Sequence, residues 1–272
     1  MSMNLKSLLI SLALSLFCGL ANAALPSSVS DEEIYQYIDQ IGLKDTYKSL
    51  TDQIAAMSQQ QKLTNPNPEV VDQSTKLVID TWSPSEAMTI TSDYIRANTS
   101  EKQFLALREW QNSSLAKTMS NEELQATQAS FQADLMHYMA VLQTNPPKQE
   151  MVTAIQNLVV STRMTESTVE LVLNIMKSMA QASGQAGLEN FEAMEQQMKP
   201  MLQAQMKQQM IMTSYYIYRN VSPEQLDEYT AFYQSELGSH ELDLSWSAIE
   251  ESFKPWSKRL GAEMLKQKVA NK

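Results

Sequence analysis

Apolar residues recur along this chain at the three- and four-residue spacings of amphipathic helices. The clearest run places Ile34, Tyr37, Ile38 and Ile41 at positions i, i+3, i+4 and i+7, which lie on one face of an α-helix. The chain has no long alternation of apolar and polar residues, which is the pattern of a half-buried strand. The sequence therefore predicts an all-α protein built as a multi-helix bundle.

Capping signals mark where several helices begin and end. Ser30 with Glu33 has the spacing of a capping box, and Gly42 is placed to end the same helix in a left-handed conformation. Ser83 followed by Pro84 marks another start, because proline is favoured at the first helical position. Further helices are predicted over residues 47–57, 69–80 and 120–142, and the last would open with a capping box of Ser120 and Glu123.

The same pattern occurs twice, about 122 residues apart. Residues 91–103 read TSDYIRANTSEKQ and residues 213–225 read TSYYIYRNVSPEQ, so seven of the thirteen positions are identical. Matching of this density indicates an internal duplication. We expect two tandem similar helical units, 24–144 and 148–268, that form either one pseudo-symmetric bundle or two lobes.

The repeated segment has the features of a helix–turn–helix corner. Asn98 and Asn220 tolerate a left-handed conformation and are expected to end a helix. The next helix would then begin with a capping box in each copy, formed by Ser100 with Gln103 and by Ser222 with Gln225. The identical positions of the two copies offer no activated nucleophile, so the segment predicts architecture and not catalysis.

The N-terminal residues have the features of a secretory signal peptide. Lys6 precedes an apolar stretch over 8–20, and Ala21-Asn22-Ala23 supplies small residues at the −3 and −1 positions of a cleavage site. We expect residues 1–23 to be removed after Ala23 and the mature chain to be periplasmic. Cys18 is the only cysteine, so the mature chain would have no disulfide, thiolate metal site or cysteine nucleophile.

The charge of the chain limits its partners. The formal net charge is −10, and such an acidic chain is poorly suited to nucleic acid, whose phosphates attract clusters of Lys and Arg. No segment after the signal peptide is long and apolar enough for a transmembrane helix. The partners that remain are other envelope proteins or an apolar ligand, and the oligomeric state stays open.

One short segment of the second unit carries a family resemblance. Residues 232–238 read FYQSELG, which resembles the F-Y-x-S-x-x-G signature of the helical periplasmic family called domain of unknown function 2059. The resemblance covers residues 200–260, and the first unit is a degenerate copy with Trp110, Gln111, Ser113 and Ala116 at the matching positions. It implies a helical exported protein and supplies no catalytic residues. The candidate motif residues are Phe232 as a core residue, Tyr233, Ser235 as a local backbone partner, and Gly238 as a helix stop.

Methionines form the second candidate site. Met194, Met198 and Met201 lie near one face of a helix that Pro200 interrupts. Thioethers bind Cu(I), and methionine-rich faces also make adaptable apolar binding surfaces, although methionine is most often core filler. His137 and His240 lack zinc-site spacing, and each is expected to be a partly exposed helix residue.

The leading hypothesis is a non-enzymatic periplasmic binding protein. It would hold protein segments or a small apolar ligand in a groove between the two units. No catalytic residue and no cofactor are predicted. The alternatives are a Cu(I)-binding protein that uses Met194, Met198 and Met201, and a hydrolase of envelope polymers with convergent acids or a His–acid pair.

Overall fold

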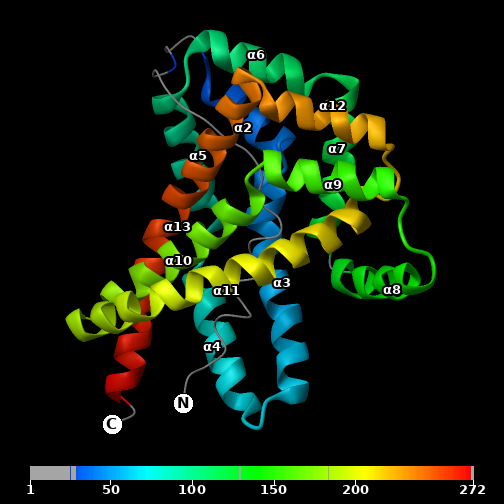
Figure 1. The fold of residues 1–272 in the computed structure, drawn as a ribbon. Helices are drawn as coiled ribbons and strands as arrows, with labels where there is room; N and C mark the ends of the chain where they lie inside the picture. The colour runs from blue at the N-terminus through cyan, green and yellow to red at the C-terminus, as the bar shows by residue number, and fades with distance from the viewer. Residues whose placement is uncertain (1–24, 26–28, 129, 183, 271–272) are drawn as a thin grey trace.

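The computed structural model describes residues 25, 29–128, 130–182 and 184–270, so the expected signal peptide 1–23 lies outside them. These residues form helices and contain no strand, which confirms the all-α prediction (Figure 1). The elements are α2 (Asp31–Gln40), α3 (Leu43–Thr64), α4 (Pro68–Thr81), α5 (Pro84–Asn98), α6 (Glu101–Gln111), α7 (Ser114–Glu123), the 3-10 helix η2 (Leu124–Thr127), α8 (Phe131–Thr144), α9 (Gln149–Ser161), α10 (Met164–Ala182), α11 (Gln185–Ile217), α12 (Pro223–Gln234) and α13 (Glu236–Ala270).

Most predicted helix starts are confirmed. The Ser30 side chain accepts the backbone N–H of Glu33, and the Glu33 carboxylate accepts the backbone N–H of Ser30, so the capping box is complete. Gly42 lies in the left-handed region between α2 and α3, with φ +77°. The capping boxes of α6 and α12 are also complete, at Ser100 with Gln103 and at Ser222 with Gln225.

Several local predictions differ from the structure. The helix expected over 120–142 is divided into α7, η2 and α8. Ser120 lies inside α7, and the Glu123 carboxylate accepts hydrogen bonds from distant tyrosines, so the two residues do not start a helix there. Asn98 is the last residue of α5, as expected, but neither Asn98 nor Asn220 is left-handed; the Asn98 amide instead donates to the carbonyl oxygen of Tyr94. Pro200 does not interrupt α11, which continues through it.

The hydrophobic core has two clusters, and each contains residues from both halves of the sequence. The first cluster combines side chains of α2 to α6 with side chains of α10 and α13. The second combines α7 and α8 with α9 to α12 and the first turns of α13. Figure 1 shows the same crossing, since α13 from the end of the chain runs beside α5 and α10. The two halves are therefore interleaved in the core.

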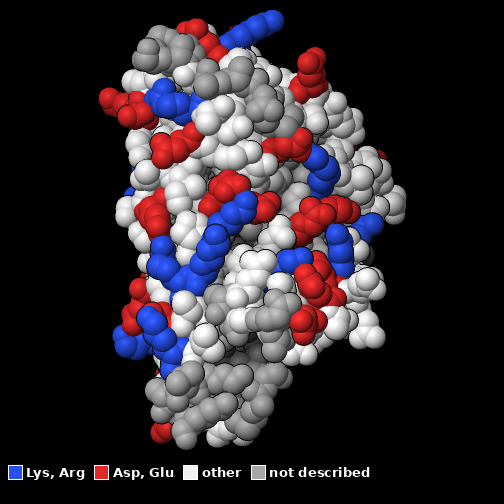
Figure 2. Space-filling model, turned by 90° about the vertical axis from the view of Figure 1, so that its left-hand side faces the viewer, with Lys and Arg blue, Asp and Glu red and all other residues white. Residues whose placement is uncertain are grey.

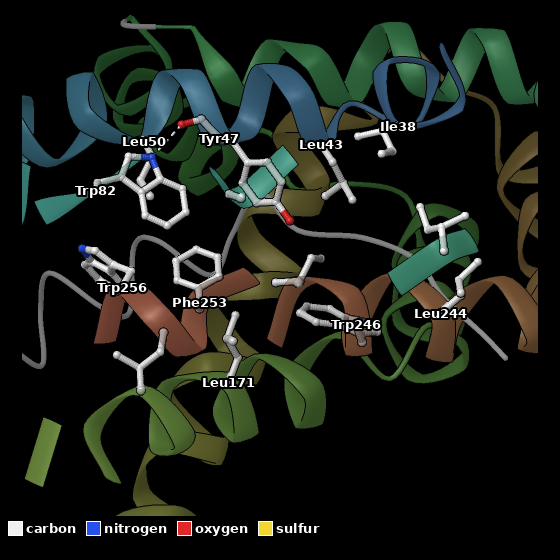
Figure 3. Close-up of a cluster of buried hydrophobic side chains, with 14 of the residues drawn as sticks. Ile38, Leu43, Tyr47, Leu50, Trp82, Leu171, Leu244, Trp246, Phe253 and Trp256 are labelled. Atoms are coloured by element: carbon white, nitrogen blue, oxygen red, sulfur yellow. Dashed lines mark hydrogen bonds between the residues drawn. The ribbon is translucent and has the colours of Figure 1, made fainter. Parts of the chain in front are cut away.

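Aromatic packing holds α13 against the first half. The Trp82 and Phe253 rings stack with centroids 4.9 Å apart, and the Trp82 indole N–H donates to the carbonyl oxygen of Tyr47 at 3.0 Å (Figure 3). The Tyr47 hydroxyl lies 3.1 Å from the Ser252 Oγ of α13. This arrangement buries large aromatic side chains while giving their polar atoms partners, which is what a stable core requires.

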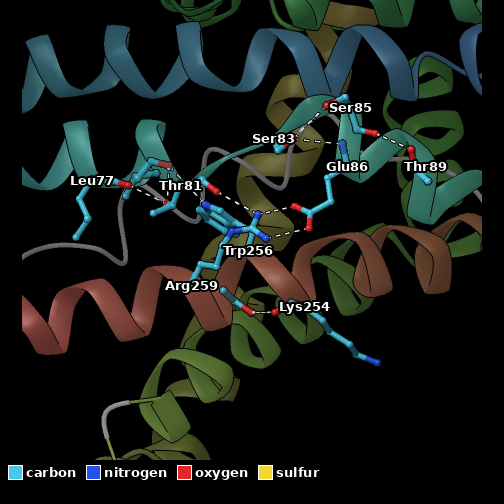
Figure 4. A network of polar contacts seen from close by, with 11 residues as sticks. Leu77, Thr81, Ser83, Ser85, Glu86, Thr89, Lys254, Trp256 and Arg259 are labelled. Atoms are coloured by element: carbon cyan, nitrogen blue, oxygen red, sulfur yellow. Dashed lines mark hydrogen bonds and ion pairs between the residues drawn. The ribbon is translucent and has the colours of Figure 1, made fainter.

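A charged contact fixes the same interface at its edge. The Arg259 guanidinium of α13 donates to both carboxylate oxygens of Glu86 in α5, at 2.9 and 2.5 Å, and also to the carbonyl oxygen of Thr81 at 3.2 Å (Figure 4). Two parallel bonds of this kind specify orientation as well as contact. The pair therefore sets how α13 lies across the α4–α5 corner.

Several local features recur at matching positions of the two halves. Gly42 and Arg163, 121 residues apart, are both left-handed at the start of α3 and α10, with φ +77° and +51°. Ser113 and Ser235 each accept the backbone N–H of the third residue of the following helix. These features agree with the predicted duplication, which itself stays a prediction.

No helix in the described part of the chain is long and apolar enough to cross a membrane. On the face drawn in Figure 2, acidic and basic side chains are interspersed.

Candidate functional site

A pocket lies where elements of both halves meet. Its walls come from the α2–α3 junction, from α7 and η2, from the first residue of α10, and from the C-terminal part of α11. It contains about 620 Å³ of empty space, including the part open to solvent, and most of its exposed wall is apolar. The apolar lining residues are Ile41, Leu124, Ala126, Met164, Met210 and Ile217. A mostly apolar wall with a few polar side chains is typical of small-molecule sites.

Glu123 is the only charged side chain among the described residues that line this pocket. It is the last residue of α7, and its Oε1 accepts the hydroxyl of Tyr218 at 2.7 Å and the hydroxyl of Tyr229 at 3.0 Å. Burial raises the pKa of Glu123, and the two tyrosine bonds partly offset that rise. The carboxyl therefore has one oxygen, Oε1, held in place by two tyrosine hydroxyls.

The second copy of the repeated segment supplies part of the same wall. Thr213 and Ser214, the first two residues of that copy, both line the pocket. The buried Thr213 Oγ1 has no hydrogen-bond partner in the described chain. Its counterpart in the first copy, Thr91, is bonded to the Tyr47 hydroxyl at 2.9 Å. The start of the repeated segment therefore lies in the core with its threonine hydroxyl hydrogen-bonded in the first half, and forms part of the pocket wall in the second half.

A neighbouring pocket shares η2 as its wall. Ala126 and Thr127 line both pockets, and the second one is completed by α3 and the start of α8. It contains about 480 Å³ of empty space, again counting its open part. The 3-10 helix η2, which interrupts the helix expected over 120–142, thus separates two adjoining pockets.

Glu241 of α13 is a second carboxyl, completely buried beneath the surface. Its Oε1 accepts the Tyr37 hydroxyl at 2.9 Å and the Gln111 amide at 2.7 Å. Burial raises the pKa of Glu241 to about 7, the bonds from Gln111 and Tyr37 lower it, and the charge of Glu123 raises it further. Glu241 Oε2 has no partner in the described part of the chain. Glu241 does not line the pocket, so the two carboxyls do not converge on one cavity.

His240 is buried, which corrects the expectation that it is partly exposed. Its Nδ1 lies 3.1 Å from the Gln103 amide nitrogen, while the Gln103 carbonyl oxygen completes the capping box of α6 with Ser100. A residue of the repeated corner thus connects α6 to α13. His137 is exposed on α8, as expected.

The four motif residues form the corner between α12 and α13. The Phe232 ring stacks on Trp110, and the Tyr233 hydroxyl donates to the hydroxyl of Tyr229 at 3.0 Å. Ser235 caps α13, as its Oγ accepts the Gly238 N–H at 3.1 Å and donates to the Phe232 carbonyl oxygen at 2.6 Å. Ser235 is thus a local backbone partner, as expected.

Gly238 is not a helix stop, because it lies in the first turn of α13. Its role is close approach: a Cβ built there would lie 2.0 Å from the Phe232 carbonyl oxygen. The motif therefore brings the end of α12 against the start of α13, and Tyr233 connects it to the tyrosines beside Glu123.

The methionine candidates do not share one environment. Met198 is buried in the second core cluster, whereas Met194 is 48% exposed and Met201 is 58% exposed. Other methionines of α11, Met206 and Met210, are buried, and Met210 lines the pocket. The described residues contain no group of three or more His, Cys, Asp or Glu side chains placed to hold a metal ion.

Sequence reasoning missed Glu123, Tyr218 and Thr213 as site residues. Glu123 and Tyr218 are 95 residues apart in the chain, so no local spacing connects them. One sequence feature does point to Thr213: the repeated segment begins with two hydroxyl residues on a helix. Hydroxyl groups need hydrogen-bond partners when they are buried.

Comparison with protein-family models, with curated proteins and with solved structures gives no match.

Proposed function

We propose that this chain is an exported, non-enzymatic binding protein of the periplasm, and that it holds a small apolar ligand in the pocket between its two halves. The observation that carries the proposal is the pocket itself, which has a mostly apolar wall and a few polar side chains from both halves of the chain. A small number of polar groups at defined positions in an apolar wall orients a bound small molecule. Because the wall closes around the space from several helices, it fits a small molecule better than an extended protein segment.

A solvatochromic dye tests binding. Nile red, a neutral apolar dye, is expected to bind one to one with a blue-shifted emission. Ser120 is partly buried in the pocket wall, so Ser120→Phe fills the space and is expected to abolish the shift. Ser114→Phe, on the exposed side of the same helix, is the matched control and should leave binding unchanged. Equal binding by both variants, or no binding by the unmodified chain, would contradict the proposal.

Processing tests the export part. The mass of the chain recovered from a periplasmic extract should correspond to cleavage after Ala23. Ala23→Phe should block cleavage, whereas Asn22→Ser should not, since small residues are required only at the −3 and −1 positions. Recovery of the intact chain from the cytoplasm would contradict export.

A further inference from the structure

The polar side of the pocket has the chemistry to select a ligand headgroup. We infer that the ligand carries a protonated amine, which donates hydrogen bonds to the Glu123 carboxylate while its apolar body packs against Met164, Met210 and Ile217. This inference rests on the proposed function, because it concerns the same pocket.

The charge of the wall supports an amine. Glu123 is the one charged side chain in the described lining, and its charge is negative. The basic residue nearest in sequence to the α11 wall, Arg219, is engaged elsewhere: its guanidinium donates to the Tyr216 carbonyl oxygen at 2.6 Å and to Gln125 Oε1 at 2.6 Å. An anionic headgroup would therefore meet a carboxylate with no lining cation to balance it, which is unfavourable in a partly buried site.

The geometry of the carboxyl supports the same conclusion. The two tyrosine hydroxyls both donate to Oε1, so they fix the orientation of the carboxyl group at the pocket wall. An ammonium group supplies up to three donors and no acceptor. Burial of the Glu123 carboxyl disfavours its charge, and a cation beside it would reverse that effect.

Hydroxyl groups are available for the remaining donors of the amine. Thr213 Oγ1 has no partner in the described chain, and Ser214, Thr127 and Ser120 also line the pocket. A hydroxyl accepts as well as donates, so it can complete the coordination of an ammonium group next to the carboxylate.

Three probes with the same apolar body test the inference: 4-phenylbutylamine, 4-phenylbutanol and 4-phenylbutyrate, titrated calorimetrically into the full mature chain. We expect the amine to bind at least about tenfold more tightly than the alcohol, since a charge-assisted hydrogen bond contributes about 1.5–3 kcal/mol. The carboxylate should bind more weakly than the alcohol.

Glu123→Gln keeps an acceptor for the tyrosines and removes the charge, so it should remove the preference for the amine and leave alcohol binding within about twofold. Glu122→Gln is the matched control. That neighbouring carboxylate does not line the pocket and accepts instead from Gln125 and Asn220, so its loss should leave the preference intact.

The outcomes separate the two claims. Equal affinity for the three probes, or an amine preference that survives Glu123→Gln, would overturn the headgroup inference and leave the proposed function standing. No binding of any probe would overturn both. If Glu123→Gln does not fold, the salt dependence of binding to the unmodified chain tests the inference. Added salt should weaken binding of the amine but not of the alcohol. An amine affinity that does not respond to salt would overturn the inference.

Discussion

The Trp110 ring of α6 and the Phe232 ring of α12 lie nearly parallel, with centroids 3.8 Å apart and planes inclined by 8°. The two residues stand at matching positions of the predicted repeat, 122 residues apart in the chain. The stack therefore joins the two halves of the chain directly, and the Tyr229 ring is also nearly parallel to Trp110, with centroids 6.3 Å apart.

The stack is expected to contribute to stability beyond its buried area. Trp110→Leu, Phe232→Leu and the double variant form a thermodynamic cycle, and we predict a coupling of about 0.5–1.5 kcal/mol, the usual size for aromatic pairs. Trp110→Phe is the control, because it keeps a stacked ring and removes an indole N–H that is buried without a partner in the described chain. Denaturant unfolding measures each value, and additive single losses would show that the rings do not interact.

Gly238→Ala is predicted to destabilise the fold by about 3 kcal/mol or more, at the upper end of what overpacking costs. A Cβ at this position would meet the backbone carbonyl of Phe232, which cannot rotate away. Ala116→Gly at the matching position of α7 should cost only the helix propensity difference of about 1 kcal/mol. Thermal unfolding of both variants tests this, and a Gly238→Ala protein as stable as the unmodified chain would refute the close approach of α12 and α13.

Buried Glu241 predicts that stability depends on pH. Its pKa is raised from 4.5 to about 7 in the folded chain, so the folded state binds this proton more tightly than the unfolded state does. The contribution is fully present below pH 4.5 and is lost as the pH rises through about 7, with a total of about 3 kcal/mol at 1.36 kcal/mol per pKa unit. Glu241→Gln should remove this dependence and be more stable than the unmodified chain at pH 8.

Denaturant unfolding between pH 5 and pH 8 measures the effect. Glu236→Gln, at an exposed position of the same helix, should retain the full pH dependence. A Glu241→Gln variant with an unchanged pH profile would mean that another group is responsible.

The methionines of α11 are predicted to differ in role. Met198→Ala should cost about 2–5 kcal/mol because it leaves a cavity in the second core cluster. Met201→Ala, at an exposed position of the same helix, should change stability by no more than about 0.5 kcal/mol. An anaerobic Cu(I) titration tests the copper-binding alternative. Cu(I) affinity that each of the two substitutions abolishes would favour copper binding. Such binding would also require Met198 to leave the core.

The sequence predicts the parts of this fold that depend on neighbouring residues. The capping boxes at Ser30 and Ser100 join atoms three residues apart, so spacing alone reveals them. Gly42 was identified by the conformational freedom that a left-handed helix end requires. Such local rules are enough to assign the fold class and most helix starts.

Long-range contacts explain what the sequence could not predict. Ser120 and Glu123 have the spacing of a capping box, yet Glu123 bonds to Tyr218 and Tyr229 and the helix starts elsewhere. Glu241 has its hydroxyl partner 204 residues away, at Tyr37. Because the halves interleave in two shared core clusters, the pocket depends on how distant segments pack against one another. Patterns along the sequence do not reveal which distant segments come together.

Methionine methyl resonances provide the most direct test of a ligand site between the halves. With 13C-methyl methionine in the mature chain, titration of neutral 4-phenylbutanol should shift the signals of Met164 and Met210, which line the pocket, and leave Met194 and Met201 unchanged. Ser120→Phe should prevent the shifts. Unchanged Met164 and Met210 signals at saturating probe, or shifts of equal size at the exposed methionines, would contradict the account.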